Sequence, residues 1–479
     1  MNFKAIRFVL SWVLKIEALC MLLPLICGFC YGENQNIIIW IFSIGLCLLF
    51  GFGICLKTPA NKTMYAKEGF VSVALSWIVM SIFGAVPFVL SGTIPSFVDA
   101  VFETVSGFTT TGASIMADVE SAPKSMLFWR SFTHWIGGMG VLVFITAFIP
   151  LKGSGNFQLI KAESPGPSVS KLVPKAKSTA KILYGIYLFI TLLQITLLFL
   201  GGMSFFDSVT LTFGTVGTGG FGVRNSGIAD YSSYSQIVIT VFMILCGIDF
   251  SVYYLLLMRK FKAAVSSSEV RCYLGIIVTA IILVSISIYP MFGNLFDTVK
   301  HSAFQVGSII TTTGYSTVDF NLWPEFSKAI LVVLMFIGAC AGSTGGGIKV
   351  SRIMILLKSI VKEIRILAHP KSTLKIKLNG RVVEHETVRA VNVFLVAYLA
   401  VFAFSLLVIS VDNLDFTSNF TAVAATINNI GPGLAAVGPV SNFSAYSPLS
   451  TVVLIFDMLI GRLEVFPILL LFSPYTWKK

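Results

Sequence analysis

Long apolar stretches recur along almost the whole chain, and they constrain its fold more than any other feature. A helix that crosses a bilayer needs about 20 mostly apolar residues. Ten stretches meet this requirement, at residues 10–31, 36–56, 69–91, 127–150, 182–202, 234–258, 272–292, 327–357, 389–411 and 448–472. With 56% hydrophobic and 12% charged residues, the chain carries more apolar surface than one water-facing core can bury. We therefore expect an all-α integral membrane protein, which excludes a disordered chain, a nucleic-acid-binding domain and a soluble enzyme.

The charged residues orient these spans. With the N-terminus placed in the cytoplasm, 28 of the 34 Lys and Arg residues fall on inner segments, and 12 of the 22 acidic residues fall on the outer side. Cytoplasmic loops of membrane proteins carry such an excess of basic residues. Both termini are therefore predicted to be cytoplasmic, and the net charge of +12 needs no nucleic-acid partner. The outer acidic residues would either concentrate cations at an external mouth or be scattered, solvated loop charge.

Four shorter semi-apolar stretches, too short to cross the membrane, share one ending. They lie at residues 95–108, 204–216, 295–310 and 415–428, and each runs into a Gly-rich or Thr-rich sequence. The first and third have Phe, Thr-Thr-Thr, Gly and Ser at identical offsets. The glycines that we align, Gly112, Gly219, Gly314 and Gly431, recur about every 100 residues. This internal duplication predicts four units of span, short helix, Gly turn and span.

The unit boundaries follow from this repeat. Two N-terminal spans occupy residues 1–58, and the four units occupy residues 59–160, 161–265, 266–370 and 371–479. Non-helical backbone at membrane depth survives only where protein buries it or where it lines an aqueous path. Four such loops around one axis would direct carbonyl groups, helped by Thr hydroxyls, into a shared pore, and could replace the hydration shell of a monovalent cation. The negative C-terminal ends of the short helices would stabilise that cation.

A Gly-rich run interrupts the span at 327–357. Five glycines fall between Gly338 and Gly347, and each costs a helix about 0.8–1.0 kcal/mol relative to Ala. We expect this run to be unwound and mobile, with close packing against neighbouring helices as the alternative. Lys349 directly follows it, in a position to face the inner mouth.

Arg462 is the one basic residue assigned to the interior of a span. An unpaired charge at the bilayer centre costs at least about 2.5–3.5 kcal/mol, so this side chain needs a pore or a partner. We expect Arg462 to face the cavity under the filter and to repel permeating cations. The alternative is a salt bridge to Asp249 on another span.

The remaining polar residues point to structural roles. Glu103 is expected to brace the first loop by accepting backbone N–H bonds, and His134 to pack or to form a hydrogen bond. Neither the run from Gly214 to Gly222 nor that from Gly342 to Lys349 fits a nucleotide-binding motif. The four His residues show no metal-ligand spacing. We therefore expect neither an enzyme nor a cofactor.

At this point the sequence resembles the Trk/Ktr/HKT superfamily of potassium transporters, most closely its bacterial TrkH/TrkG branch. The resemblance covers essentially the whole chain and includes Phe128 to Ser131, His134 to Gly140, Gly342 to Lys349 and Gly461 to Glu464. By position, the residues that match the family's potassium-binding filter are Thr110, Thr111, Gly112, Gly217, Thr218, Gly219, Thr312, Thr313, Gly314, Asn429, Ile430 and Gly431. The second and fourth units depart from the Thr-Thr-Thr pattern, which leaves the preference for potassium over sodium open. The filters are also simpler than the Thr-Val-Gly-Tyr-Gly filter of tetrameric potassium channels, so weaker selectivity is expected.

The resemblance implies a function and its partners. It implies potassium uptake across the bacterial inner membrane through a single-subunit pore, with a symporter coupled to H⁺ or Na⁺ as the alternative. The gate residues that we single out are Gly342, Gly345, Gly346, Gly347, Lys349 and Arg462. The family further implies a homodimer and a cytosolic nucleotide-binding regulatory ring of the TrkA type. The basic loop at 349–389 would bind that ring or anionic membrane lipids.

Overall fold

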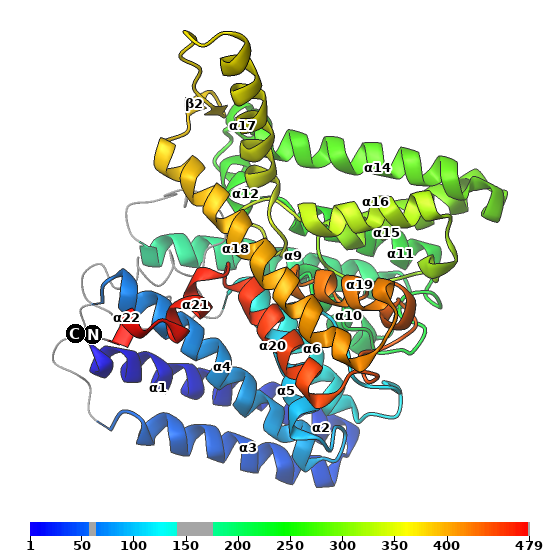
Figure 1. Cartoon of the computed structure of the whole chain (residues 1–479). Helices are drawn as coiled ribbons and strands as arrows, with labels where there is room; N and C mark the ends of the chain where they lie inside the picture. Colours follow the sequence, from blue (N-terminus) through cyan, green and yellow to red (C-terminus); the bar gives the residue numbers. More distant parts are fainter. Residues whose placement is uncertain (57–63, 141–175, 478–479) are drawn as a thin grey trace.

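The chain is almost entirely helical, as the apolar stretches predict. The computed structural model describes residues 1–56, 64–140 and 176–477. Within these ranges the strands form one short antiparallel hairpin, made of β1 (Lys377–Leu378) and β2 (Arg381–Val382). Figure 1 shows long helices packed alongside one another, with short helices enclosed among them.

Each of the four predicted units contains a long first helix, a short helix and a second helix. The N-terminal region before them holds α1 (Phe3–Cys20), α2 (Leu22–Tyr31) and α3 (Asn34–Gly53). The first unit holds α4 (Ala66–Leu90), α5 (Phe97–Phe108) and α6 (Lys124–Gly138). The second holds α9 (Ala176–Leu200), α10 (Phe205–Val216), α11 (Ser233–Cys246), α12 (Phe250–Leu257) and α13 (Phe261–Val265). The third holds α14 (Ser268–Phe292), α15 (Leu295–Ile310), the 3₁₀ turn η1 (Phe320–Leu322), α16 (Glu325–Ile337) and α17 (Val350–Ala368). The fourth holds α18 (His385–Ile409), η2 (Ser410–Asp412), α19 (Phe416–Ile427), η3 (Ala435–Val437), α20 (Pro448–Arg462), α21 (Phe466–Phe472) and α22 (Pro474–Trp477).

The four short helices α5, α10, α15 and α19 begin in the same way. A side-chain oxygen of Ser96, Ser204, Asn294 or Asp415 accepts a hydrogen bond from a backbone N–H in the first turn. Such N-caps satisfy donors that the helix itself leaves free. Three of these helices also carry an Asp in the first turn, where the helix dipole favours negative charge. Part of the outer acidic excess therefore serves to start the short helices.

In the second, third and fourth units the second span is not one continuous helix, which corrects the predicted spans at 234–258 and 448–472 and confirms the interruption expected within 327–357. The helices α11 and α12 meet at 91°. The helix α16 ends at Ile337 and α17 starts only at Val350, while α20 ends at Arg462 and α21 starts at Phe466. In the first unit α6 ends at Gly138, and the latter part of the predicted span at 127–150 lies outside the described residues.

Close backbone approach at glycine explains where two of these second helices end. A Cβ atom on Gly137 would lie 1.8 Å from the carbonyl oxygen of Phe108, and one on Gly461 would lie 2.0 Å from that of Ile427. Each second helix therefore ends against the last turn of its own unit's short helix. Within the described residues, six helical segments are long and apolar enough to cross a membrane, with α1 and α2 counted together as one, or seven if α11 and α12 also count as one span.

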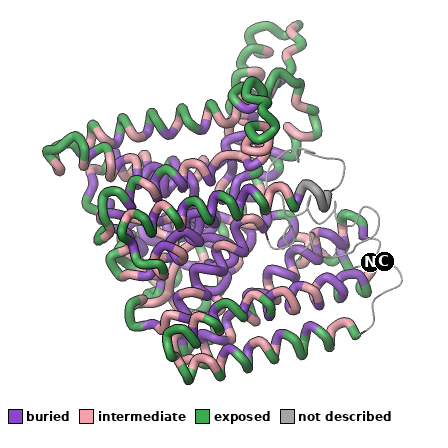
Figure 2. Tube along the Cα trace, turned by 180° about the vertical axis from the view of Figure 1, so that it is seen from behind, coloured by how far each residue is buried: buried purple, intermediate pink, exposed green. Residues whose placement is uncertain are grey.

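Burial follows the same plan. The short helices are largely buried, whereas outer helices such as α3 and α14 expose large apolar side chains, including Ile38 (70% exposed) and Ile286 (69%). Figure 2 shows this contrast between a buried centre and exposed outer helices. Outer helices with so many exposed large apolar side chains are typical of a protein surface that contacts lipid. The first and last helices of the described chain meet, since the rings of Phe3 in α1 and Trp477 in α22 stack with centroids 6.4 Å apart.

Candidate ion pathway

All four short helices end in the same backbone motif. The N–H groups of Thr111, Gly219, Thr313 and Ile430 donate to the carbonyl oxygen five residues earlier, at 2.9, 2.7, 2.8 and 2.8 Å. The residues just before them have left-handed backbone angles: Thr110 (φ 55°), Thr218 (54°), Thr312 (58°) and Asn429 (56°). These are the features of the Schellman motif, which satisfies the last carbonyls of a helix. The repeat seen in the sequence is thus a repeat of helix endings.

Left-handed angles at threonine are unfavourable by about 1–2 kcal/mol, and here the side chains at these positions make specific contacts. Thr110 Oγ1 accepts a hydrogen bond from Arg462 at 3.2 Å, and Thr312 Oγ1 accepts one from the N–H of Gly346 at 2.6 Å. The amide of Asn429 donates to the carbonyl oxygen of Met458 at 2.9 Å. Three of the four helix endings are therefore tied to the breaks in the second spans.

Four glycines form the next layer, and each packs on the following unit. Gly112, Gly220, Gly314 and Gly431 have φ of 79°, 82°, 85° and 97°. A Cβ atom at these positions would lie 2.0 Å from Gly219 O, 1.9 Å from Thr313 O, 2.0 Å from Ile430 O and 2.8 Å from Thr111 O, respectively. The contacts run from unit one to two, two to three, three to four and four back to one. The loops therefore form a closed ring with pseudo-fourfold symmetry within one chain.

This ring corrects the sequence alignment of the second unit. The sequence pattern aligns Gly219 with Gly112, but the glycine with the equivalent backbone angle and contact is Gly220. Thr218 therefore corresponds to Thr110, and Gly219 corresponds to Thr111. The carbonyl oxygens of Gly219 and Thr111 occupy equivalent positions in the ring. Gly217 lies one position outside the three-residue motif, at the end of α10. In the other three units the predicted residues fall at equivalent positions.

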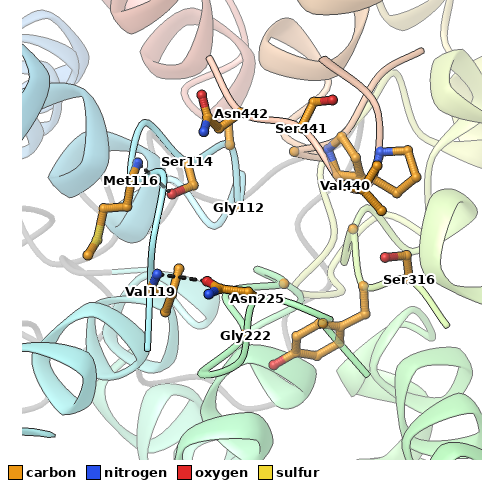
Figure 3. Close-up of a pocket in the computed structure, with 18 of the residues that line it drawn as sticks. Gly112, Ser114, Met116, Val119, Gly222, Asn225, Ser316, Val440, Ser441 and Asn442 are labelled. Atoms are coloured by element: carbon orange, nitrogen blue, oxygen red, sulfur yellow. Dashed lines mark hydrogen bonds between the residues drawn. The ribbon is translucent and has the colours of Figure 1, made fainter. Parts of the chain in front are cut away.

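The mouth above the ring is an open cavity of about 190 Å³ to which all four units contribute. Figure 3 shows loop segments from the four units converging on it, with Gly112, Ser114, Ser316 and Ser441 among the labelled residues. The charged residues in its lining are Arg130 and Arg224, and no acidic residue of the described ranges lines it. The expectation that outer acidic residues concentrate cations directly at this mouth is therefore not met by its lining.

Cross-unit hydrogen bonds hold the mouth in shape. Between the first two units, the side-chain oxygen of Asn225 accepts from Val119 N at 2.8 Å, and its amide donates to Asp118 at 2.7 Å. This bond from Asn225 is the main cause that lowers the pKa of Asp118. The last and first units are joined by the N–H of Phe443, which donates to Ser114 O at 2.9 Å.

The Gly-rich run lies directly beneath the ring. Besides the bond from Gly346 to Thr312, a Cβ atom on Gly345 would lie 2.8 Å from Thr311 O, and one on Gly346 would lie 2.4 Å from Asn428 O. Lys349 is buried, and its Nζ donates to the carbonyl oxygen of Gly345. We call residues 338–349 the inner loop. It is non-helical, as expected, and its backbone packs closely against the ring.

Arg462 bridges three units under the ring. Its guanidinium donates to Gly137 O (2.5 Å), Thr344 O (2.8 Å) and Gly138 O (3.0 Å), in addition to Thr110. The alternative salt bridge to Asp249 is not formed, because that carboxylate caps α12 by accepting from Ser251 N at 2.8 Å. The side chain lies next to the ring, where it donates to the Thr110 hydroxyl, and carbonyl oxygens accept its other hydrogen bonds.

Buried groups brace the first loop from the side. Glu103 accepts from the N–H of Ile115 at 2.9 Å, as expected, and also forms a buried ion pair with Arg130 at 2.5 Å. Sequence reasoning missed this pairing, although a basic residue next to an apolar span was a usable signal. His134 makes one hydrogen bond to Gly107 O at 2.7 Å and accepts another from Phe221 N at 3.2 Å. Its predicted structural role is confirmed.

The fold and the ring define a class of protein: a multi-pass membrane protein whose four pore-loop units surround one axis within a single chain. The chain belongs to the TrkH family, whose model is described as a cation transport protein and matches residues 39–479.

Individual relatives agree with this assignment over the full length. The Trk system potassium uptake protein TrkH of Escherichia coli (strain K12) is 35% identical over 488 residues, which covers the whole of both chains. The Trk system potassium uptake protein TrkG of the same strain is 32% identical over 99% of each chain. The crystal structure of the potassium transporter TrkH from Vibrio parahaemolyticus superposes with a TM-score of 0.89 at 31% identity and covers all of both chains.

Proposed function

We propose that this chain mediates potassium uptake through its own central pore. The observation that carries the proposal is the closed ring, in which the carbonyl groups of Thr111, Gly219, Thr313 and Ile430 stand at equivalent positions around one axis. Rings of backbone carbonyls replace the hydration shell of a monovalent cation. The short helices add their negative C-terminal ends at the same level. The relatives that match over their full length carry the name of potassium uptake proteins.

The gate in this proposal is the inner loop together with Arg462. Gly345 and Gly346 lie in van der Waals contact with the filter backbone, and the ammonium group of Lys349 and the guanidinium of Arg462 lie close below it. Two positive charges under a cation filter oppose the exit of potassium into the cell. Opening would require the inner loop, including Gly342 and Gly347, to move away from the ring.

The setting of this pore is part of the same proposal. The basic inner segments favour a bacterial inner membrane location with both termini in the cytoplasm. A homodimer and a cytosolic nucleotide-binding ring of the TrkA type fit the Trk system to which the named relatives belong. The basic region after the inner loop is the surface that such a ring or anionic lipid would contact.

Cation flux into proteoliposomes tests the proposal. The purified protein is reconstituted alone, and the uptake of K⁺, Rb⁺, Na⁺ and Li⁺ is compared under an imposed potential. Faster uptake of K⁺ and Rb⁺ than of Na⁺ and Li⁺ is expected, and equal uptake of all four ions would refute the assignment of potassium. The reversal potential at several pH values and Na⁺ gradients separates a pore from a symporter, since only a symporter would follow a second ion.

A further inference from the structure

One carboxylate holds both ends of the inner loop. Glu269, in the first turn of α14, accepts a hydrogen bond from Ala341 N at 2.7 Å and another from Ser351 N at 3.2 Å, both on Oε1. Ala341 lies near the start of the loop, and Ser351 follows its end. Hydrogen bonds to an ionised acceptor are about twice as strong as neutral ones. Glu269 thus fixes the loop at both ends from one point.

The second unit supports the same loop through its own break. The N–H of Cys340 donates to Gly247 O at 3.0 Å, and the N–H of Phe250 donates to Gly342 O at 3.0 Å. On the far side, Arg352 donates to Ile348 O at 3.1 Å and pairs with Glu464 at 2.5 Å. Among these attachments, Glu269 differs in its position. It lies in the first turn of a long helix, and the predicted topology places the start of that helix on the cytoplasmic side.

That first turn is attached to the cytoplasmic hairpin. The residue next to Glu269, Ser268, donates its N–H to Oδ1 of Asn379 at 2.6 Å. Asn379 lies in the turn between β1 and β2, and the hairpin is held to α17 by Lys358, whose Nζ donates to Lys377 O at 2.8 Å. The hairpin carries exposed basic side chains and extends from the body of the molecule together with α17 (Figure 1).

We propose that Glu269 is a positioning residue that keeps the inner loop under the filter, and that the β1–β2 hairpin controls it through the contact between Asn379 and Ser268. A force on the hairpin moves the first turn of α14, and with it the carboxylate that holds Ala341 and Ser351. This inference rests on the proposed function, because it assigns the inner loop as the gate.

Two readouts test the inference, and one of them does not depend on the transported ion. Cys340 lies in the inner loop and is fully buried, so its reaction with a charged methanethiosulfonate reports whether the loop has left its place. The background replaces the seven other cysteines with serine. The second readout is K⁺ flux into proteoliposomes. The variants are Glu269→Ala, Glu269→Gln and Asn379→Ala, and the matched control is Glu363→Ala, which removes an exposed carboxylate from α17.

Glu269→Ala is expected to raise both the labelling rate of Cys340 and the K⁺ flux about tenfold. The loss of charge-assisted hydrogen bonds changes the equilibrium constant between the closed and the open position of the loop by about that factor. Glu269→Gln keeps an oxygen acceptor and should give a smaller increase, as should Asn379→Ala, while Glu363→Ala should match the parent. If Glu269→Ala does not fold, the same comparison is made with Glu269→Gln.

The outcomes separate the two proposals. A folded Glu269 variant with the parent's labelling rate overturns the inference, whatever the flux. An increase at Glu269 without any at Asn379 overturns the part that concerns the hairpin. If neither the parent nor a Glu269 variant with faster labelling conducts K⁺, the proposed function is refuted, and the labelling of Cys340 still decides whether Glu269 holds the loop.

Discussion

A methyl group at Gly220 should disable the filter. This glycine has φ of 82°, and a Cβ atom would lie 1.9 Å from Thr313 O, whereas real Cβ contacts are essentially never under 3.0 Å. In Gly220→Ala the carbonyl of Thr313 must therefore move by about 1 Å or more, and the alanine also holds a backbone angle that is unfavourable by about 1–2 kcal/mol. The displaced carbonyl belongs to the ring, so the contact with the ion that the proposed function assigns to it would be lost.

The size of the effect follows from that one lost contact. A hydrogen-bond-like contact to a charged group contributes about 1.5–3 kcal/mol, and 1.4 kcal/mol corresponds to a factor of ten. We expect the K⁺ flux of Gly220→Ala in proteoliposomes to fall ten- to a hundredfold, with a reduced preference for K⁺ over Na⁺.

Gly222→Ala is the matched control for this prediction. It lies two residues further along the same loop, and the nearest atom to an added Cβ is Arg224 O at 3.5 Å, an ordinary contact. We expect this variant to keep the parent's flux and selectivity. The reasoning is refuted if folded Gly220→Ala transports like the parent, or if both variants lose transport to the same extent.

Three further predictions concern the gate and the brace. Arg462→Ala should raise the K⁺ flux severalfold by removing a positive charge below the filter, whereas Arg462→Lys, which keeps the charge, should not; equal flux in all three proteins would contradict the charge-barrier role. Gly346→Ala, whose added Cβ would lie 2.4 Å from Asn428 O, should push the inner loop away from the filter and raise the flux, and an unchanged flux would show that the loop does not block the pathway. Glu103→Gln leaves Arg130 buried without its ion partner at 3% exposure, and should destabilise the protein by about 3–5 kcal/mol, measured as lowered resistance to thermal unfolding in detergent; an unchanged midpoint would contradict the bracing role.

The sequence was sufficient to predict the elements that depend on local pattern. The predicted short stretches at 95–108 and 295–310 differ from α5 and α15 by at most two residues at either end, because apolar periodicity, N-caps and Gly-rich endings are all local signals. The breaks in the second spans were predicted only where glycines are dense, between Gly338 and Gly347. Elsewhere the break depends on contact with another element, such as Gly461 against Ile427 O.

The register of the second filter loop required the structure for a similar reason. The segment Gly217-Thr218-Gly219-Gly220 offers three glycines to an alignment, and local sequence does not say which one meets the third unit. The choice is made by contacts from distant residues: Gly219 faces the ring of His134, and Gly220 faces Thr313. The partners of Arg462 were likewise invisible, since they come from the first and third units.

The closed ring of four glycines also has an evolutionary consequence. In a tetramer of identical subunits every mutation is copied four times, so a change at the filter or gate alters all four sides of the pore at once. Here each quadrant is encoded separately, and the quadrants have already diverged to Thr-Thr-Gly, Thr-Gly-Gly, Thr-Thr-Gly and Asn-Ile-Gly. One quadrant supplies the inner loop and another supplies Arg462. In the proposed function, selection can therefore change one unit of the pore at a time, and the effect reaches directly only the neighbouring unit on which that unit packs.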